Sequence, residues 1–365
     1  MNFLIVTEPD DVHAIIVTLV LQSYEHQVVN LFSADFPTRQ KNTISIDSQG
    51  YRCHTEDDFQ ILNHVGYDVV WWRRPRQPKF AKNQVHPDDY KFHRRESLLF
   101  HENFTYQLAP GAWWVNRKEA AVRANYKLLQ LKIANEVGMQ VPETLCSNSD
   151  AEIVQFYLRH QRKGVVYKPL TYQVWQETEG FKVFYTSKIE QLETLQQANS
   201  QFYPGIYQEC IPKQYELRVI CFGDYIIAAR INSQKYEEGH IDWRALDMHQ
   251  LEIEPYVLPE RLKQQIRFLM RELGIVFGCL DFIVTPDDHY IFLEVNEQGQ
   301  FLFLEDCCED LPMLDIFVYF LMQQSIDFYW IKRHNLHRVD DYRSAIDKIY
   351  QQNITNHLSI KGGQI

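Results

Sequence analysis

The sequence predicts a mixed α/β protein made of two or three subdomains. Its opening reads as a buried strand (NFLIVT, residues 2–7), an apolar helix (residues 11–26) and a second strand (QVVNLF, residues 27–32). This order is typical of a parallel α/β unit. Strand-like and helical segments keep alternating further along. At 365 residues, the chain is also long for one hydrophobic core.

The composition is that of an ordinary globular protein and excludes several classes. Its 37 basic and 48 acidic residues give a net charge of -11, which argues against non-specific nucleic-acid binding. We find no apolar run of about 18 residues and no basic segment at the N-terminus, so we expect neither a membrane span nor a secretion signal. Seven scattered cysteines, without a CxxC pair, suggest reduced thiols and a cytoplasmic protein.

Changes of pattern divide the chain into four predicted segments. Residues 1–115 form an N-terminal α/β domain that contains "YDVVWWRRP" (67–75) and ends near Val115. Two further subdomains are expected, and a polar tail with a weak helical pattern follows them. The predicted bounds of these three segments are 116–204, 205–330 and 331–365.

A predicted hairpin near the C-terminus carries oxygen-bearing side chains. "CLDFIV" (279–284) and "YIFLEVN" (290–296) flank a turn at 286–288, so Asp281 is expected close to Glu294 and Asn296. Two carboxylates and an amide oxygen suit Mg²⁺. The alternative is that Glu294 pairs with a buried arginine.

Four cations precede these carboxylates in apolar surroundings. Lys127 lies in a helical segment and Lys168 ends the β-branched strand "GVVYKPL". Arg218 and Arg230 lie on the two arms of a second predicted hairpin, which turns at Gly223-Asp224. Cations in such positions need anions, and a nucleoside triphosphate would supply them. The alternative is a set of internal salt bridges.

The cations and carboxylates described above, taken in their order along the chain, resemble those of an ATP-grasp ligase from roughly Asn116 to Phe320. The N-terminal domain then corresponds to a pre-ATP-grasp domain. The likeness is greatest to the graspetide (microviridin-type) peptide maturases, or macrocyclases. The motifs that carry it are "VVYKPL", "QECI", "ELRV", "AARI", "LDFIV" and "LEVNEQGQF", together with "DVVWWRRP", "IDWR" (241–244) and "DLPMLDIF".

The resemblance implies a role for each matching residue. Lys127 and Lys168 would hold the phosphates of ATP, and Lys213 or Glu216 would meet the ribose. The segment "YQECIP" would meet adenine, through Glu209, Cys210 and Ile211. Residues implied near the reacting groups are Arg218 and Arg230 as catalytic arginines, Arg244 beside them, and Asp281, Glu294 and Asn296 as Mg²⁺ ligands.

The resemblance also implies an activity and partners. The enzyme would use ATP and Mg²⁺ to phosphorylate an Asp or Glu side chain of a ribosomally made precursor peptide, with leader and core. A Ser or Thr hydroxyl, or a Lys amine, would then close a macrocyclic ester or amide. Such ligases often form homodimers, although no sequence feature marks an interface. Two alternatives stay open: a ligase that adds an amino acid to a small acid or protein, and a nucleotide-binding regulator or scaffold.

Overall fold

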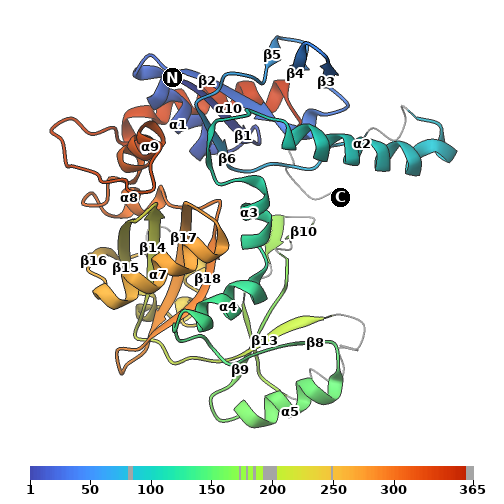
Figure 1. Cartoon of the computed structure of the whole chain (residues 1–365). Coiled ribbons are helices and arrows are strands. Elements are labelled where there is room, and N and C mark those ends of the chain that lie inside the picture. The colour runs from blue at the N-terminus through green and yellow to red at the C-terminus, as the bar shows by residue number, and fades with distance from the viewer. Residues whose placement is uncertain are drawn as a thin grey trace. The chain divides into compact units, whose positions relative to one another are not determined.

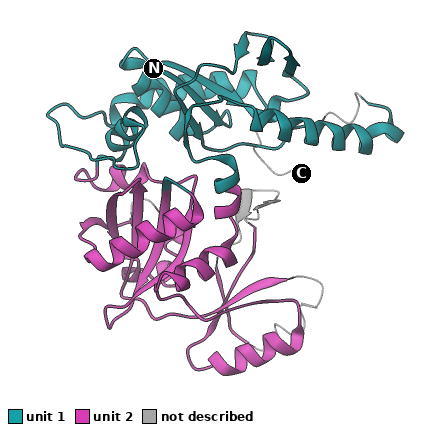
Figure 2. Ribbon diagram, viewed as in Figure 1, with its two compact units in different colours: residues 1–121, 275–277, 312–360 teal, residues 122–274, 278–311, 361–365 magenta. Residues whose placement is uncertain are grey.

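The computed structural model describes residues 1–80, 85–171, 174–177, 180–183, 186–191, 204–247 and 250–358. These residues form two compact units (Figures 1 and 2). Unit 1 comprises Met1–Ala121, Ile275–Phe277 and a C-terminal segment that begins at Pro312. Unit 2 comprises Val122–Gly274 and Gly278–Leu311.

Unit 1 is built on a parallel sheet with the strand order β2-β1-β6-β7. A second, antiparallel sheet has the order β3-β4-β5. The elements of unit 1 are β1 (Asn2–Thr7), α1 (Val12–Ser23), β2 (Gln27–Phe32), β3 (Lys41–Asp47), β4 (Gly50–Glu56), β5 (Ile61–Asn63), β6 (Val69–Trp72), α2 (Tyr90–Tyr106), β7 (Trp113–Val115), α9 (Met313–Gln323) and α10 (Arg343–Asn356). Helix α3 (Lys118–Ala124) contains the boundary between the units.

The parallel sheet of unit 1 is buried on both faces, which explains its uninterrupted apolar strands. Val70 and Trp72 belong to one core cluster, which also contains Phe104 of α2. On β6 the intervening Trp71 packs against Phe317 of α9, with ring centroids 4.6 Å apart. Helices α9 and α10 both contact α1, so the C-terminal segment completes the core of unit 1.

Unit 2 contains a five-stranded sheet, a four-stranded sheet and a hairpin, with the orders β16-β15-β14-β17-β18, β12-β9-β13-β8 and β10-β11. Its elements are α4 (Lys127–Glu136), β8 (Thr144–Ser147), α5 (Asp150–His160), β9 (Val165–Lys168), β10 (Val174–Glu177), β11 (Gly180–Val183), β12 (Ser187–Ile189), β13 (Gly205–Glu209), β14 (Tyr215–Phe222), β15 (Tyr225–Ile231), β16 (Ile253–Tyr256), α7 (Glu260–Leu273), β17 (Phe277–Val284), β18 (Tyr290–Asn296) and α8 (Phe303–Cys307).

Local sequence explains the elements around the larger sheet. The predicted turn at Gly223-Asp224 is confirmed, because Phe222 pairs with Tyr225 and Gly223 has a φ of 60°. Helix α7 buries Ile266, Leu269 and Leu273. It ends at Gly274, whose φ of 77° is a left-handed conformation that glycine adopts easily. Figure 1 shows α7 lying across this sheet.

The mixed α/β class predicted from the sequence is confirmed. The main boundaries between the two observed units lie after Ala121 and at Pro312. Most of the predicted polar tail consists of an irregular segment, a short 3-10 helix (Val339–Tyr342) and α10, and residues 359–365 of that tail lie outside the described residues. The predicted boundaries at 115, 204 and 330 stay predictions. No helix in the described ranges is long and apolar enough to cross a membrane.

Candidate active site

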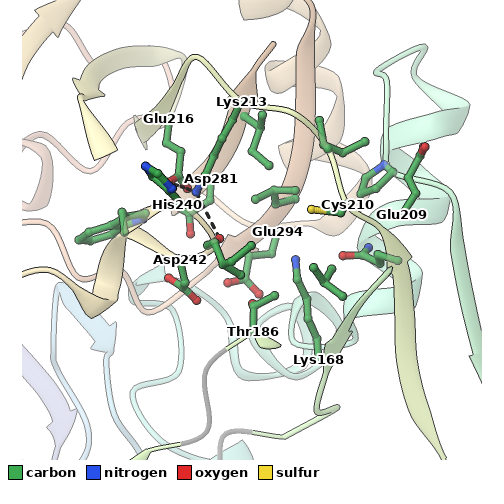
Figure 3. A pocket seen from close by; sticks show the side chains of 18 of the residues that line it. Lys168, Thr186, Glu209, Cys210, Lys213, Glu216, His240, Asp242, Asp281 and Glu294 are labelled. Carbon is green, nitrogen blue, oxygen red and sulfur yellow. Dashed lines mark hydrogen bonds and ion pairs between the residues drawn. The ribbon is translucent and has the colours of Figure 1, made fainter. Parts of the chain in front are cut away.

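Unit 2 holds a cleft that opens to solvent (Figure 3). One part of its wall is apolar and includes Val166, Ile283 and Leu293. The remainder is densely charged. The predicted site residues that line the cleft are Lys168, Glu209, Cys210, Ile211, Lys213, Glu216, Arg244, Asp281 and Glu294.

Strands β17 and β18 bring two predicted metal ligands together. Asp281 and Glu294 are direct cross-strand partners, beside an irregularity in the register, so the predicted hairpin is confirmed. Asn296 pairs with Cys279, two positions nearer the end of the ladder. Its Oδ1 accepts backbone N–H bonds from Gln298 and Gly299, each at 3.0 Å.

Arg218 holds the Asp281 carboxylate in place. Its Nη1 donates to both oxygens of Asp281, at 2.8 and 2.9 Å, and its Nη2 donates to the Gln300 carbonyl at 2.8 Å. The Arg218 residue is only 4% exposed. A buried charge of this kind needs its partner, so we interpret Arg218 as the group that orients Asp281.

Glu294 is surrounded by cations from three different elements. Its two oxygens lie 3.3 Å from Lys127 Nζ and 3.5 Å from Arg244 Nη1. Burial acts to raise the pKa of Glu294, but Lys127, Arg244 and Lys168 outweigh it and hold the pKa below its usual range. Glu294 is therefore ionised at neutral pH.

Arg244 reaches Glu294 because Asp242 holds its other side. Asp242 accepts Arg244 Nε and Nη2, each at 2.8 Å, and the Asp242 side chain is itself buried. The sequence prediction includes Arg244 but omits Asp242, which lines the same cleft. The Asp-x-Arg spacing within "IDWR" was the signal that could have identified it.

Lys168 differs from the other cations of the described cleft residues, because it lies in no direct ion pair. Among the described residues no carboxylate forms an ion pair with its Nζ, and Figure 3 shows the side chain pointing into the cleft. Burial lowers the pKa of the Lys168 ammonium, and Glu294 offsets this only in part. An anionic ligand would remove this imbalance.

A second buried ion pair lies further along the cleft. Lys213 Nζ donates to Glu216 Oε1 at 2.6 Å, and Ser233 Oγ donates to the same oxygen at 2.8 Å. Lys213 also donates to the carbonyl of Ile241, at 3.2 Å. Among the described residues no hydrogen bond reaches the other carboxylate oxygen of Glu216, so this oxygen can accept a ligand hydroxyl.

The segment predicted to meet adenine runs along the apolar side of the cleft. Cys210 N–H donates to the Gly164 carbonyl at 2.9 Å. The Glu209 carboxylate accepts Lys163 Nζ at 2.9 Å and Glu143 N–H at 3.1 Å. The side chain of Glu209 is thus engaged by the protein, and in the described part of the chain the backbone N–H of Ile211 has no hydrogen-bond partner.

The structure places Arg230 away from the charged residues that surround Asp281 and Glu294. Arg218 pairs with Ala229 and Leu217 pairs with Arg230, so the two arginines project from opposite faces of the sheet. Arg230 lies over the Tyr215 ring at 4.0 Å and 3.4 Å from Glu254. It is held by these groups on the face away from Asp281.

The charges of the cluster fit a metal-nucleotide complex. The cations Lys127, Lys168, Lys213, Arg218 and Arg244 outnumber by one the carboxylates Glu216, Asp242, Asp281 and Glu294. Asp281 and Glu294 are hard oxygen donors on adjacent strands, which suit Mg²⁺. Within the described ranges, no three His, Cys, Asp or Glu side chains form a metal-binding group. A metal here would therefore need phosphate oxygens or waters as further ligands.

Solved structures share this fold over nearly their whole length. The RiPP-associated ATP-grasp ligase of Chryseobacterium gregarium, solved with ADP and a leader and core peptide, has a TM-score of 0.79 at 24% identity, covering 90% of this chain and 99% of that one. Macrocyclase MdnC of Microcystis aeruginosa MRC, bound with precursor peptide MdnA, has a TM-score of 0.75 at 29% identity, covering 88% and 100%. Macrocyclase MdnB from the same source has 0.71 at 27%, covering 88% and 98%. No family model and no curated protein matches the sequence.

Proposed function

We propose that this chain is an ATP-grasp ligase, similar to the RiPP-associated ligase and the macrocyclases, and that it closes macrocycles in a ribosomally made peptide. An Asp or Glu side chain of the precursor is the acyl donor, and a Ser or Thr hydroxyl or a Lys amine is the acceptor. The peptide partner, with leader and core, and a cytoplasmic location are parts of this proposal.

ATP occupies the charged cleft of unit 2 in the proposed complex. Adenine lies against Val166, Ile283 and Leu293, where the Ile211 N–H can donate to its edge. The ribose hydroxyls meet Glu216, while Lys127 and Lys168 hold the phosphates. The observation that carries this assignment is Lys168, a half-buried ammonium in a cleft that otherwise pairs its charges.

Asp281 and Glu294 are the proposed protein ligands of Mg²⁺. The metal would neutralise part of the charge on the phosphates. Asn296 is the third expected ligand, but two backbone N–H groups already engage its Oδ1. We therefore propose that the two carboxylates dominate metal binding.

The reaction has two steps. A peptide carboxylate oxygen attacks the γ-phosphorus of ATP, the bond to the β-phosphate oxygen breaks, and ADP leaves. The acceptor oxygen or nitrogen then attacks the acyl carbon, the acyl C–O bond to the phosphate breaks, and the acceptor's proton ends on the departing inorganic phosphate. The protein contributes fixed charges aimed at the transferring group, which is the main source of catalysis in phosphoryl transfer. Arg218 acts by positioning Asp281, and Arg244 is the guanidinium nearest Glu294.

Glu294→Gln tests the metal assignment, with Mn²⁺ as the probe in the presence of ADP. Neutralising one of two carboxylates should weaken Mn²⁺ binding by tenfold or more, measured by electron paramagnetic resonance. Peptide-dependent ADP release should also be lost. Glu254→Gln is the matched control, because Glu254 is an exposed carboxylate on the same sheet. Unchanged Mn²⁺ affinity in Glu294→Gln would refute the assignment.

The macrocyclase proposal has its own test. A candidate precursor peptide encoded beside the gene is co-expressed with the enzyme, and its mass is measured. Each ring should remove one water, whereas a ligase that adds an amino acid would increase the mass. A regulator or scaffold would leave the mass unchanged and would bind nucleotide without ADP release.

A further inference from the structure

The outer edge of β18 is closed by a side chain from α4. Strand β18 is the last strand of the five-stranded sheet, and Figure 1 shows α4 beside it. Gln130 Oε1 accepts the Val295 N–H at 2.9 Å, and Gln130 Nε2 donates to the Val295 carbonyl at 2.9 Å. One amide thus pairs with both backbone groups of Val295, as a neighbouring strand would.

The same amide holds the beginning of α4. Gln130 Nε2 also donates to the carbonyl of Ala124, the last residue of α3, and this bond closes the turn between the two helices. Among the described residues, the N-cap Tyr126 makes no capping bond with its side chain. The first turn of a helix lacks intrahelical partners for its N–H groups and tends to fray. Gln130, which is only 2% exposed, therefore fixes an end that would otherwise be weakly held.

A second tie joins this turn to the chain that follows β18. Asn125 Nδ2 donates to Glu297 Oε1 at 2.7 Å. Asn125 precedes α4, and Glu297 lies two residues after Val295. Two ties at neighbouring positions of both segments set where α4 begins along β18.

These ties locate two residues of the charged cleft. Lys127 is the first residue of α4 and lies three before Gln130, so the two share one face of the helix. Lys127 Nζ lies 3.3 Å from Glu294 Oε2, and Glu294 directly precedes Val295. We propose that Gln130 is a positioning residue that holds Lys127 against Glu294 and so aims its ammonium at the nucleotide phosphates. This inference rests on the proposed function, in which Lys127 binds those phosphates.

The lysine side chain alone would not define this position. Lys127 has a flexible stem of four carbons, and its side chain is 33% exposed, so the place of its ammonium depends on where its backbone is held. A slip of α4 by one residue would move Lys127 about 1.5 Å along the helix axis. A displacement of that size is sufficient to misalign a group that contacts a reacting ligand.

A double-mutant cycle tests the inference on the full-length protein. Gln130→Met removes three hydrogen bonds and keeps a side chain of similar length and helix propensity. With Mg²⁺ present, displacement of a fluorescent ADP analogue should show ADP affinity weakened by about fivefold or more, the size of effect expected for coupled residues. In the Lys127→Met background the same change should cost less than about twofold, because no ammonium remains to be positioned. A purely structural role would lower the affinity equally in both backgrounds.

A matched control changes a similar glutamine on another helix. Gln265 Nε2 on α7 donates to the Gly138 carbonyl at 2.5 Å, and Gln265 is not among the described residues that line the cleft. Gln265→Met should therefore leave ADP affinity unchanged. Urea unfolding shows whether each variant is folded. If Gln130→Met is not, Gln130→Asn replaces it, because its amide is one methylene too short to pair with Val295 in the same way.

The possible results separate this inference from the proposed function. Native ADP affinity in the folded Gln130 variant, or an equal loss in both Lys127 backgrounds, would overturn the positioning role and leave the proposed function in place. A native chain that binds no ADP would overturn the proposed function, and the positioning role with it.

Discussion

Arg218 and Arg230 have the same predicted role, but they should respond very differently to the same substitution. Arg218 and Arg230 are both predicted catalytic residues, yet they lie on opposite faces of the β14–β15 hairpin. Replacing each by glutamine removes the charge while keeping a polar side chain. The comparison therefore separates a residue of the cleft from a residue of the opposite face.

The contacts set the expected magnitudes. Arg218→Gln leaves the Asp281 carboxylate without its bidentate partner and the Gln300 carbonyl without its donor. Breaking a buried ion pair of this kind costs about 3–5 kcal/mol. Arg230 has an exposed ion-pair partner in Glu254, a ring contact with Tyr215, and a hydrogen bond from its Nε to Asn232 Oδ1 at 2.9 Å. These three contacts together amount to about 1–2 kcal/mol.

Urea unfolding measures the two free energies, and peptide-dependent ADP release measures the activities. Arg218→Gln should lose both stability and activity, because Asp281 is no longer oriented. Arg230→Gln should keep most of its activity. Equal losses of stability in the two variants, or an inactive but stable Arg230→Gln, would refute the reasoning from strand faces.

Two further predictions concern single buried groups. Burial lowers the pKa of His64 to about 4. In the unfolded chain this imidazole therefore binds a proton as the pH falls below about 6.5, whereas in the folded chain it stays neutral until the pH approaches 4. Stability should therefore fall as pH drops from 7.5 to 5, by about 2 kcal/mol from this residue, and His64→Gln should show that much less loss in pH-dependent urea unfolding. Lys168→Met should weaken ADP binding by tenfold or more in calorimetry, yet raise the unfolding free energy, because a half-buried ammonium that Glu294 only partly compensates is removed. A destabilised Lys168→Met would contradict the charge imbalance.

Local patterns were sufficient to predict the β17–β18 hairpin and the Asp281–Glu294 pair, because a short turn and two apolar strands fix their own register. The same reasoning could have separated Arg218 from Arg230. With the turn at Gly223-Asp224, Phe222 pairs with Tyr225, and counting back places Arg218 opposite Ala229. The prediction identified the hairpin but did not count its register.

Other parts of the site depend on contacts that no local pattern specifies. Glu294 contacts Lys127 from α4 and Arg244 from a short 3-10 helix (Trp243–Ala245), and these elements are far apart in sequence. The engagement of Glu209 by Lys163 depends in the same way on the pairing of β13 and β9. The sequence supplies the residue types, but only the fold determines which charges meet.

The two ends of the chain share one core, and this affects how the protein is made. Trp71 and α1 remain without Phe317 and α10 until α9 and α10 have been synthesised. A nascent chain would thus expose the apolar sheet of unit 1 until those two helices have left the ribosome. Truncation before α9 should therefore yield aggregates instead of a shorter soluble protein.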